Sequence, residues 1–264
     1  METFTYYPGC TLRTKAKDLD RYTRMSAEAL GIALCEPENW QCCGGAYTTA
    51  ANETATKLSA VRTLMAAKET KGLVTVCSAC HNVIKQTNYD ISHDSGMADK
   101  IMRYLGLDEP YNGETTVYHF LELLRDVIGF DALKEKVTNP LNGRKIAAYY
   151  GCLMLRPGKK LAMDDPENPT IMEDFITALG GTPVIYAQRN ECCGGYITME
   201  DKAQAAKRSG AVMESAQSMG ADMIITACPL CLYNLKKNSG VDLPVYYFTE
   251  ILAEALGLKE ESNE

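Results

Sequence analysis

Ten of the eleven cysteines in this 264-residue chain form two series with the same internal order. Each series has a single cysteine, then an adjacent pair, then a C-x2-C motif, spaced as C-x31-CC-x33-C-x2-C in the first and C-x39-CC-x34-C-x2-C in the second. The members are Cys10, Cys42, Cys43, Cys77 and Cys80, and then Cys152, Cys192, Cys193, Cys228 and Cys231. A repeat of this length indicates duplication, so the chain is expected to fold into two halves of the same shape around two equivalent cysteine sets.

The residues around the cysteines repeat as well. "TYYPGC" matches "AYYGC", "CCGGAYTT" matches "CCGGYITM", "VTVCSACHNVIK" matches "IITACPLCLYNLK", and "VYHFLELL" matches "VYYFTEIL". Cys35 alone lies outside the scheme, at the position of Ile185 in the second half. Since an apolar residue aligns with it, we predict that Cys35 is a buried free thiol.

Strand-like and helix-like segments alternate in both halves. Short β-rich runs end at Gly-Cys, and β-branched apolar runs end at each C-x-x-C, while the Ala-rich segments 50–71 and 199–219 have helical spacing. This alternation predicts an α/β fold with two pseudo-symmetric, Rossmann-like parallel-sheet halves, residues 1–141 and 142–264, divided within the turn-rich "TNPLNGRK". Ligands of such sheets bind past the carboxyl ends of the strands, where several of the cysteines are expected.

Composition excludes several classes of function. A net charge of −7 argues against nucleic acid as a partner. No basic start followed by an apolar run marks a signal peptide, and no stretch of 18 apolar residues predicts a membrane span, so a cytoplasmic protein is expected. In that setting an odd number of cysteines in a large chain favours metal or redox chemistry over structural disulfides.

Three kinds of thiol site remain open on the residues alone. A structural zinc takes four ligands, often from paired C-x2-C motifs, but each half has only one such motif and a fifth cysteine. A thioredoxin-like C-x-x-C dithiol would leave the other three cysteines of each half without a role. An iron–sulfur cluster uses more of the thiolates, and the glycine pair after each vicinal cysteine pair lets backbone approach a large ligand closely.

The complete pattern resembles the paired CCG domains found in the B subunit of heterodisulfide reductase, from Tyr6 to about Leu256. The resemblance implies that each domain holds a noncubane [4Fe–4S] cluster on five cysteines, giving two clusters. By position, one cluster would be held by Cys10, Cys42, Cys43, Cys77 and Cys80, and the other by Cys152, Cys192, Cys193, Cys228 and Cys231.

The resemblance also implies a reaction and partners. A small-molecule disulfide, in methanogens the one that joins coenzymes M and B, would be cleaved reductively between the two clusters. Electrons would come from a ferredoxin-type iron–sulfur protein like the C subunit of that family, with a flavoprotein like its A subunit behind it in a larger complex. The alternative is an electron-transfer CCG subunit of an oxidoreductase for lactate, glycolate, succinate or glycerol phosphate. A metal-storing scaffold without turnover is a third possibility.

Two histidines are candidate catalytic residues. His81 directly follows Cys80, whereas Leu232 occupies the same position in the second half. The alternatives are a proton donor near the substrate or a capping or surface residue. His119 matches Tyr247 in the repeat, and we expect either a hydrogen bond at the cluster edge or a packed residue at the strand–helix turn.

Overall fold

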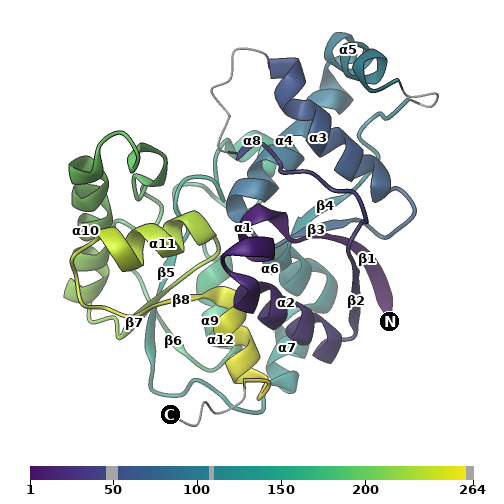
Figure 1. Cartoon of the computed structure of the whole chain (residues 1–264). Helices are drawn as coiled ribbons and strands as arrows, with labels where there is room; N and C mark the ends of the chain where they lie inside the picture. Colours follow the sequence, from purple (N-terminus) through teal and green to yellow (C-terminus); the bar gives the residue numbers. More distant parts are fainter. Residues whose placement is uncertain (46–52, 107–109, 260–264) are drawn as a thin grey trace.

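The computed structural model describes residues 1–45, 53–106 and 110–259. These residues form two four-stranded sheets in which every strand pair is parallel, with the orders β2-β1-β3-β4 and β6-β5-β7-β8. Helices surround both sheets, and the two halves lie side by side (Figure 1). The prediction of an α/β fold with two pseudo-symmetric parallel-sheet halves is therefore confirmed.

The first half contains the strands β1 (Glu2–Tyr7), β2 (Ile32–Cys35), β3 (Leu73–Thr75) and β4 (Val117–His119). Its helices are α1 (Gly9–Thr14), α2 (Lys17–Ala29), α3 (Glu53–Ala66), α4 (Ser78–His93), α5 (Ser95–Leu105), α6 (Phe120–Leu123) and α7 (Phe130–Lys136), with the π-helical segment η2 (Leu124–Ile128) between the last two. The Ala-rich run predicted as helical corresponds to α3.

The second half repeats the order with β5 (Lys145–Tyr149), β6 (Thr182–Val184), β7 (Met223–Thr226) and β8 (Val245–Tyr247). Its helices are α8 (Gly158–Leu161), α9 (Ile171–Ala178), α10 (Lys202–Ser218), α11 (Pro229–Asn238) and α12 (Phe248–Ala255), and a short 3-10 helix, η3 (Gly195–Ile197), follows the second vicinal cysteine pair. The second Ala-rich run corresponds to α10, whose first turn is capped by the Asp201 carboxylate accepting from the Gln204 amide.

The two halves share one central hydrophobic core. Phe248 of α12 packs against Phe120 of α6 and Phe175 of α9, with ring centroids 6.3 and 6.1 Å apart. Helix α12 also lies along α2, and α8 reaches across to α4 (Figure 1). A division at residues 141 and 142 stays a prediction, because the core that it would separate is continuous.

Sheet topology explains where the cysteines gather. In each sheet the chain moves to one side of the first strand and then to the other, so the loops after β1 and β3, and after β5 and β7, diverge at a switch point. A crevice forms there at the carboxyl ends of the strands. Both C-x-x-C motifs and both Gly-Cys turns stand at these ends.

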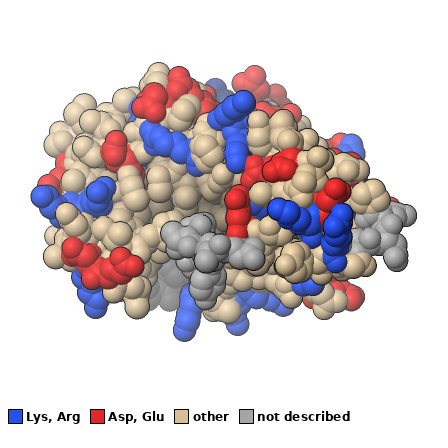
Figure 2. Space-filling view, turned by 90° about the horizontal axis from the view of Figure 1, so that it is seen from above, with Lys and Arg blue, Asp and Glu red and all other residues tan. Residues whose placement is uncertain are grey.

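The surface carries charged side chains of both signs. Acidic and basic side chains are interspersed over the face shown in Figure 2. Within the described residues, no helix combines the length and apolar character needed to cross a bilayer.

Candidate metal centre

The first cysteine set is assembled from α1, the segment after β2 and the start of α4. Cys10 lies in α1 directly after β1, Cys42 and Cys43 lie in the segment after β2, and Cys77 is the N-cap of α4, with Cys80 in its first turn. The sulfur atoms of Cys43 and Cys80 are 3.5 Å apart, and those of Cys10 and Cys42 are 3.8 Å apart. Residues as far as 70 positions apart in sequence therefore present their thiols together.

The second set has the same arrangement. The sulfurs of Cys193 and Cys231 are 3.6 Å apart, matching Cys43 and Cys80 in the first half. The amide of Gly194 donates to the sulfur of Cys192 at 3.4 Å. All eleven cysteines carry free thiols.

Exposure divides each set in the same way. The second cysteine of the vicinal pair and both cysteines of the C-x-x-C motif are buried: Cys43, Cys77 and Cys80 in the first half, and Cys193, Cys228 and Cys231 in the second. The remaining two thiols of each set are more accessible, namely Cys10 and Cys42, and Cys152 and Cys192. Each set thus has a protected side within the fold and an open side.

Neighbouring thiols separate the cysteine pKa values. Hydrogen bonding with Cys42 and Cys80 lowers the pKa of Cys43 to about 3, while the pKa of Cys80 is raised. In the second half a hydrogen bond from Cys231 lowers the pKa of Cys193 in the same way. The surroundings of the buried member of each vicinal pair thus shift its pKa toward the thiolate, which is the form of cysteine that binds metals.

Glycines allow the backbone to pass close to these sulfurs. Gly9 has φ +78°, and a Cβ atom there would lie 2.9 Å from the sulfur of Cys80. Gly151 has φ +64°, and its Cβ would lie 3.3 Å from the sulfur of Cys231. Only glycine combines positive φ with this proximity at low cost, so the Gly-Cys motif is part of each site.

A buried tyrosine anchors each vicinal pair. Tyr7 donates from its hydroxyl to the carbonyl of Gln41 at 2.8 Å, and Tyr149 donates to the carbonyl of Glu191 at 2.7 Å. Both acceptors directly precede the paired cysteines. Sequence reasoning assigned no role to these tyrosines, although their recurrence two residues before Gly-Cys in both halves was a usable signal.

The two sets meet across the boundary between the halves. The Cys77 thiol faces Cys228, and this contact is the largest cause of the raised pKa of Cys77. Ser78 donates through its amide and its hydroxyl to the carbonyl of Ala227, at 3.0 and 2.8 Å. The Tyr247 hydroxyl also contacts this carbonyl, at 3.0 Å. Ser78, within the first C-x-x-C motif, therefore binds the first half to Ala227, which directly precedes the second motif.

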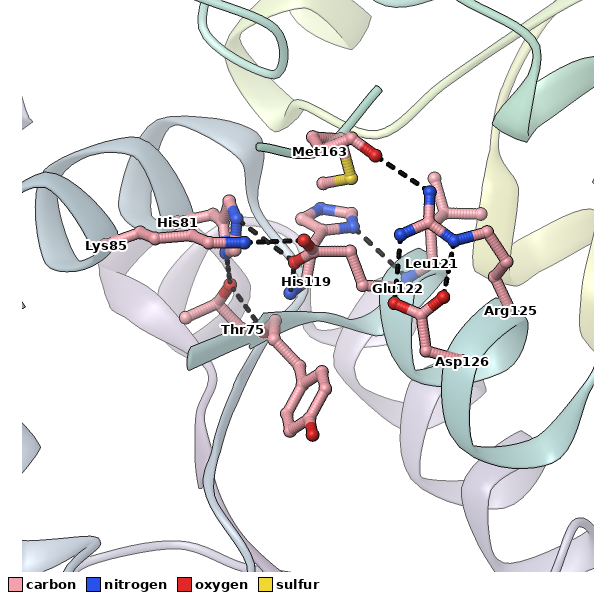
Figure 3. A network of polar contacts seen from close by, with 10 residues as sticks. Thr75, His81, Lys85, His119, Leu121, Glu122, Arg125, Asp126 and Met163 are labelled. Carbon is pink, nitrogen blue, oxygen red and sulfur yellow. Dashed lines mark hydrogen bonds and ion pairs between the residues drawn. The ribbon is translucent and has the colours of Figure 1, made fainter. Parts of the chain in front are cut away.

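His81 of α4 and His119 at the end of β4 lie in a buried polar network (Figure 3). Nδ1 of His81 is 3.1 Å from the Thr75 hydroxyl, and its Nε2 is 3.3 Å from Glu122, which also accepts from Lys85. Burial lowers the pKa of His81 well below its usual value, so the ring is neutral and its contact with Glu122 is not an ion pair. The expected alternative of a surface histidine at position 81 is wrong, because the side chain is fully buried.

His119 is a packed residue at the strand–helix turn. It caps α6 by accepting from the Leu121 amide at 3.2 Å, and its ring packs against Phe248 and His81. Burial lowers its pKa to about 3. Its Nε2 atom is buried without a hydrogen-bond partner among the described residues, and the carbonyls of Val76 and Ala227 lie beside the ring.

Cys35 differs from its prediction. Its thiol is exposed, because it ends β2, which is the edge strand of the first sheet. The alignment with Ile185 was misleading for a simple reason, since Ile185 is itself 54% exposed. Cys35 remains outside both cysteine sets.

The donor atoms suit a multi-iron group. Five sulfurs per half converge, and those of the second half line a cavity with Ser78, Tyr196 and Leu230. Within the described residues, no three or more His, Cys, Asp or Glu side chains are arranged around a position for one metal ion. Thiolate-rich, apolar surroundings with nearby backbone amides are typical of iron–sulfur sites.

Known proteins match this chain over most of its length. The cysteine-rich domain model named CCG matches residues 4–85 and 146–236. The 8-methylmenaquinol:fumarate reductase membrane anchor subunit of Wolinella succinogenes is 30% identical, over 97% of this chain and 92% of that protein. The B subunit of the ferredoxin:CoB-CoM heterodisulfide reductase of Methanosarcina mazei is 24% identical, over 99% of this chain and 91% of that protein.

A solved structure shares the fold. A hypothetical protein from Helicobacter pylori superimposes with a TM-score of 0.77 at 11% identity, covering 98% of this chain and 50% of that one. Two domain matches, ten repeated cysteines and full-length relatives together establish the family. The chain belongs to the family of CCG cysteine-rich domain proteins that includes the B subunit of heterodisulfide reductase.

Proposed function

We propose that this chain is the catalytic iron–sulfur subunit of a heterodisulfide reductase or a related complex. It cleaves a small-molecule disulfide, such as the CoM–CoB heterodisulfide, between two noncubane [4Fe–4S] clusters. The observation that carries the proposal is that the two cysteine sets meet: Ser78 of the first C-x-x-C motif donates to the carbonyl of Ala227, which precedes Cys228, and Ser78 also lines the cavity of the second set. Two separate electron carriers with no common boundary would not need this arrangement.

Each set supplies five ligands. The first cluster is assigned to Cys10, Cys42, Cys43, Cys77 and Cys80, and the second to Cys152, Cys192, Cys193, Cys228 and Cys231. The matching sulfur–sulfur distances of the two sets support these assignments, 3.5 Å between Cys43 and Cys80 and 3.6 Å between Cys193 and Cys231.

The reaction balances as R–S–S–R′ with two electrons and two protons giving R–SH and R′–SH. When bound, each cluster supplies one electron. The protein keeps the inner cysteines away from water and leaves Cys10, Cys42, Cys152 and Cys192 toward the open side, where a substrate can approach. His81 and His119, the candidate catalytic residues, are assigned to positions beside Cys80 and Cys228, because His81 directly follows Cys80 and the charge of Cys228 acts on the His119 ring.

Partners complete the proposal. We assign the electron supply to a ferredoxin-type iron–sulfur protein like the C subunit of heterodisulfide reductases and, behind it, to a flavoprotein like their A subunit, within a cytoplasmic complex. The names of the relatives, which designate subunits, support membership of a larger assembly.

The test compares two cysteine variants in the anaerobically purified complex. Cys193→Ala removes a buried ligand of the second set, and Cys35→Ala removes the exposed thiol outside both sets. We expect Cys193→Ala to lower iron and acid-labile sulfide and to abolish reduction of the CoM–CoB heterodisulfide, with Cys35→Ala unchanged in both. Zinc in place of iron, or full turnover by Cys193→Ala, contradicts the proposal.

A second candidate is an electron-transfer subunit of a quinol- or succinate-linked oxidoreductase. It is favoured by the higher identity to the fumarate reductase protein of Wolinella succinogenes, 30% against 24% for the heterodisulfide reductase protein of Methanosarcina mazei. The same preparation separates the two: fumarate reduction without disulfide reduction supports the second candidate. Bound clusters without either activity support the scaffold alternative.

A further inference from the structure

Tyr196 links the two vicinal cysteine pairs. It directly follows the second CCGG sequence, at the centre of η3, and its hydroxyl donates to the carbonyl of Gly45 at 2.7 Å. Gly45 is the last residue of the first CCGG sequence. This bond joins residues 151 positions apart, from equivalent turns of the two halves.

The surroundings of Tyr196 come from both cysteine sets. Burial raises the pKa of its phenol, and Cys228, Cys152, Cys43 and Cys77 raise it further through their proximity. Its ring lines the cavity that holds the second set, while 42% of the residue stays exposed. Tyr196 therefore lies between the two sets, with one side against the sulfurs and the other toward solvent.

The two halves differ in sequence at this position. The sequence position equivalent to Tyr196 in the first half carries Ala46, which has no hydroxyl to donate. The first vicinal turn is thus tied to the second half by Tyr196. The amides of Gly44 and Gly45 donate to the sulfurs of Cys42 and Cys43, so the position of this turn also positions two cysteines of the first set.

We propose that Tyr196 is a positioning residue that locks the first vicinal-cysteine turn onto the second half and thereby sets the separation of the two cysteine sets. The consequence of losing the hydroxyl appears in the opposite half of the molecule. The positioning role of Tyr196 stands on its hydrogen bond to Gly45. The statement that the two cysteine sets are facing cluster sites rests on the proposed function.

The test uses Tyr196→Phe, with Tyr233→Phe as its control, in the full-length, anaerobically purified protein. Tyr233 is 57% exposed in α11, and none of the described hydrogen bonds uses its hydroxyl. Hydrogen exchange is followed by mass spectrometry in peptides covering residues 40–45 and 190–195. Loss of one hydrogen bond in Tyr196→Phe is expected to speed exchange in residues 40–45 about fivefold, with residues 190–195 unchanged. Tyr233→Phe leaves both segments as in the wild type.

Electron paramagnetic resonance of the reduced protein gives the second measurement. With iron content matched to the wild type, Tyr196→Phe should change the spin coupling between the clusters, which depends on their separation. Wild-type exchange in residues 40–45, or faster exchange confined to 190–195, overturns the proposal. A protein without iron–sulfur clusters refutes the proposed function, whereas the exchange experiment still decides the role of Tyr196.

Discussion

Gly9 allows the sharpest test of how the backbone makes room for a cysteine set. Its φ of +78° is in the left-handed region, and an added Cβ would lie 2.9 Å from the sulfur of Cys80. Gly31 has nearly the same φ, +79°, but nothing lies within 4 Å of its Cβ position. Alanine at position 9 or 31 therefore imposes the same backbone strain, but only alanine at position 9 also collides with a sulfur atom.

The expected magnitudes follow from this comparison. Left-handed backbone costs a non-glycine residue about 1–2 kcal/mol, which is the expected loss in the free energy of unfolding for Gly31→Ala. Gly9→Ala should lose about 1–3 kcal/mol more, since the new methyl group overpacks the site and displaces the Cys80 sulfur. Because Cys80 is an assigned ligand, Gly9→Ala should also lose iron from the first set, whereas Gly31→Ala should retain full iron.

Two measurements check the prediction. Urea denaturation gives the free energy of unfolding of each variant, and anaerobic iron and sulfide analysis gives the content per chain. Gly151→Ala serves as the second-half counterpart with a milder contact of 3.3 Å to the Cys231 sulfur, so a smaller effect is expected. Equal stability losses in Gly9→Ala and Gly31→Ala, with full iron in both, would refute the reasoning.

Two further variants test the joint between the halves. Tyr247→Phe removes a buried hydroxyl that donates at 2.6 and 3.0 Å to the carbonyls preceding Cys77 and Cys228. The free energy of unfolding measured by urea titration should therefore fall by about 1–2 kcal/mol. A change within error would show that this bond contributes nothing to stability. The Asp90 carboxylate accepts hydrogen bonds from Lys57 and from Lys160 of the other half. Burial raises the pKa of Asp90, but these two bonds outweigh burial, so its pKa is lowered. The contribution of the ionised Asp90 carboxylate to the free energy of unfolding is therefore complete above its unfolded pKa of about 4, and it is lost as the pH falls through the lower folded pKa. Asp90→Asn should therefore reduce stability at pH 7 and flatten the acid side of the curve of stability against pH. An unchanged acid limb in that variant would contradict the assignment.

The family and the fold class followed from the sequence because the order and spacing of the cysteines and the alternation of strands and helices can be read along the chain. The order of the cysteines, the glycines beside them and the strand–helix alternation were sufficient for two parallel-sheet halves. Burial was harder to predict, as His81 and Cys35 show. His81 follows a cysteine in a helix whose buried face faces Glu122, 41 positions away, and Cys35 is on an edge strand whose position depends on the order of strands in the sheet.

By itself, the sequence determined that two equivalent thiol sets exist and which cysteines form each set, because ligand spacing and duplication are properties of the chain order. Only the tertiary structure decided that the two sets meet, with Cys77 facing Cys228 and Tyr196 reaching Gly45. These contacts join residues about 150 positions apart, and they arise because the two halves bury a common core around Phe248. Packing of apolar surface shared by the halves, which no local motif encodes, brings the two sites face to face.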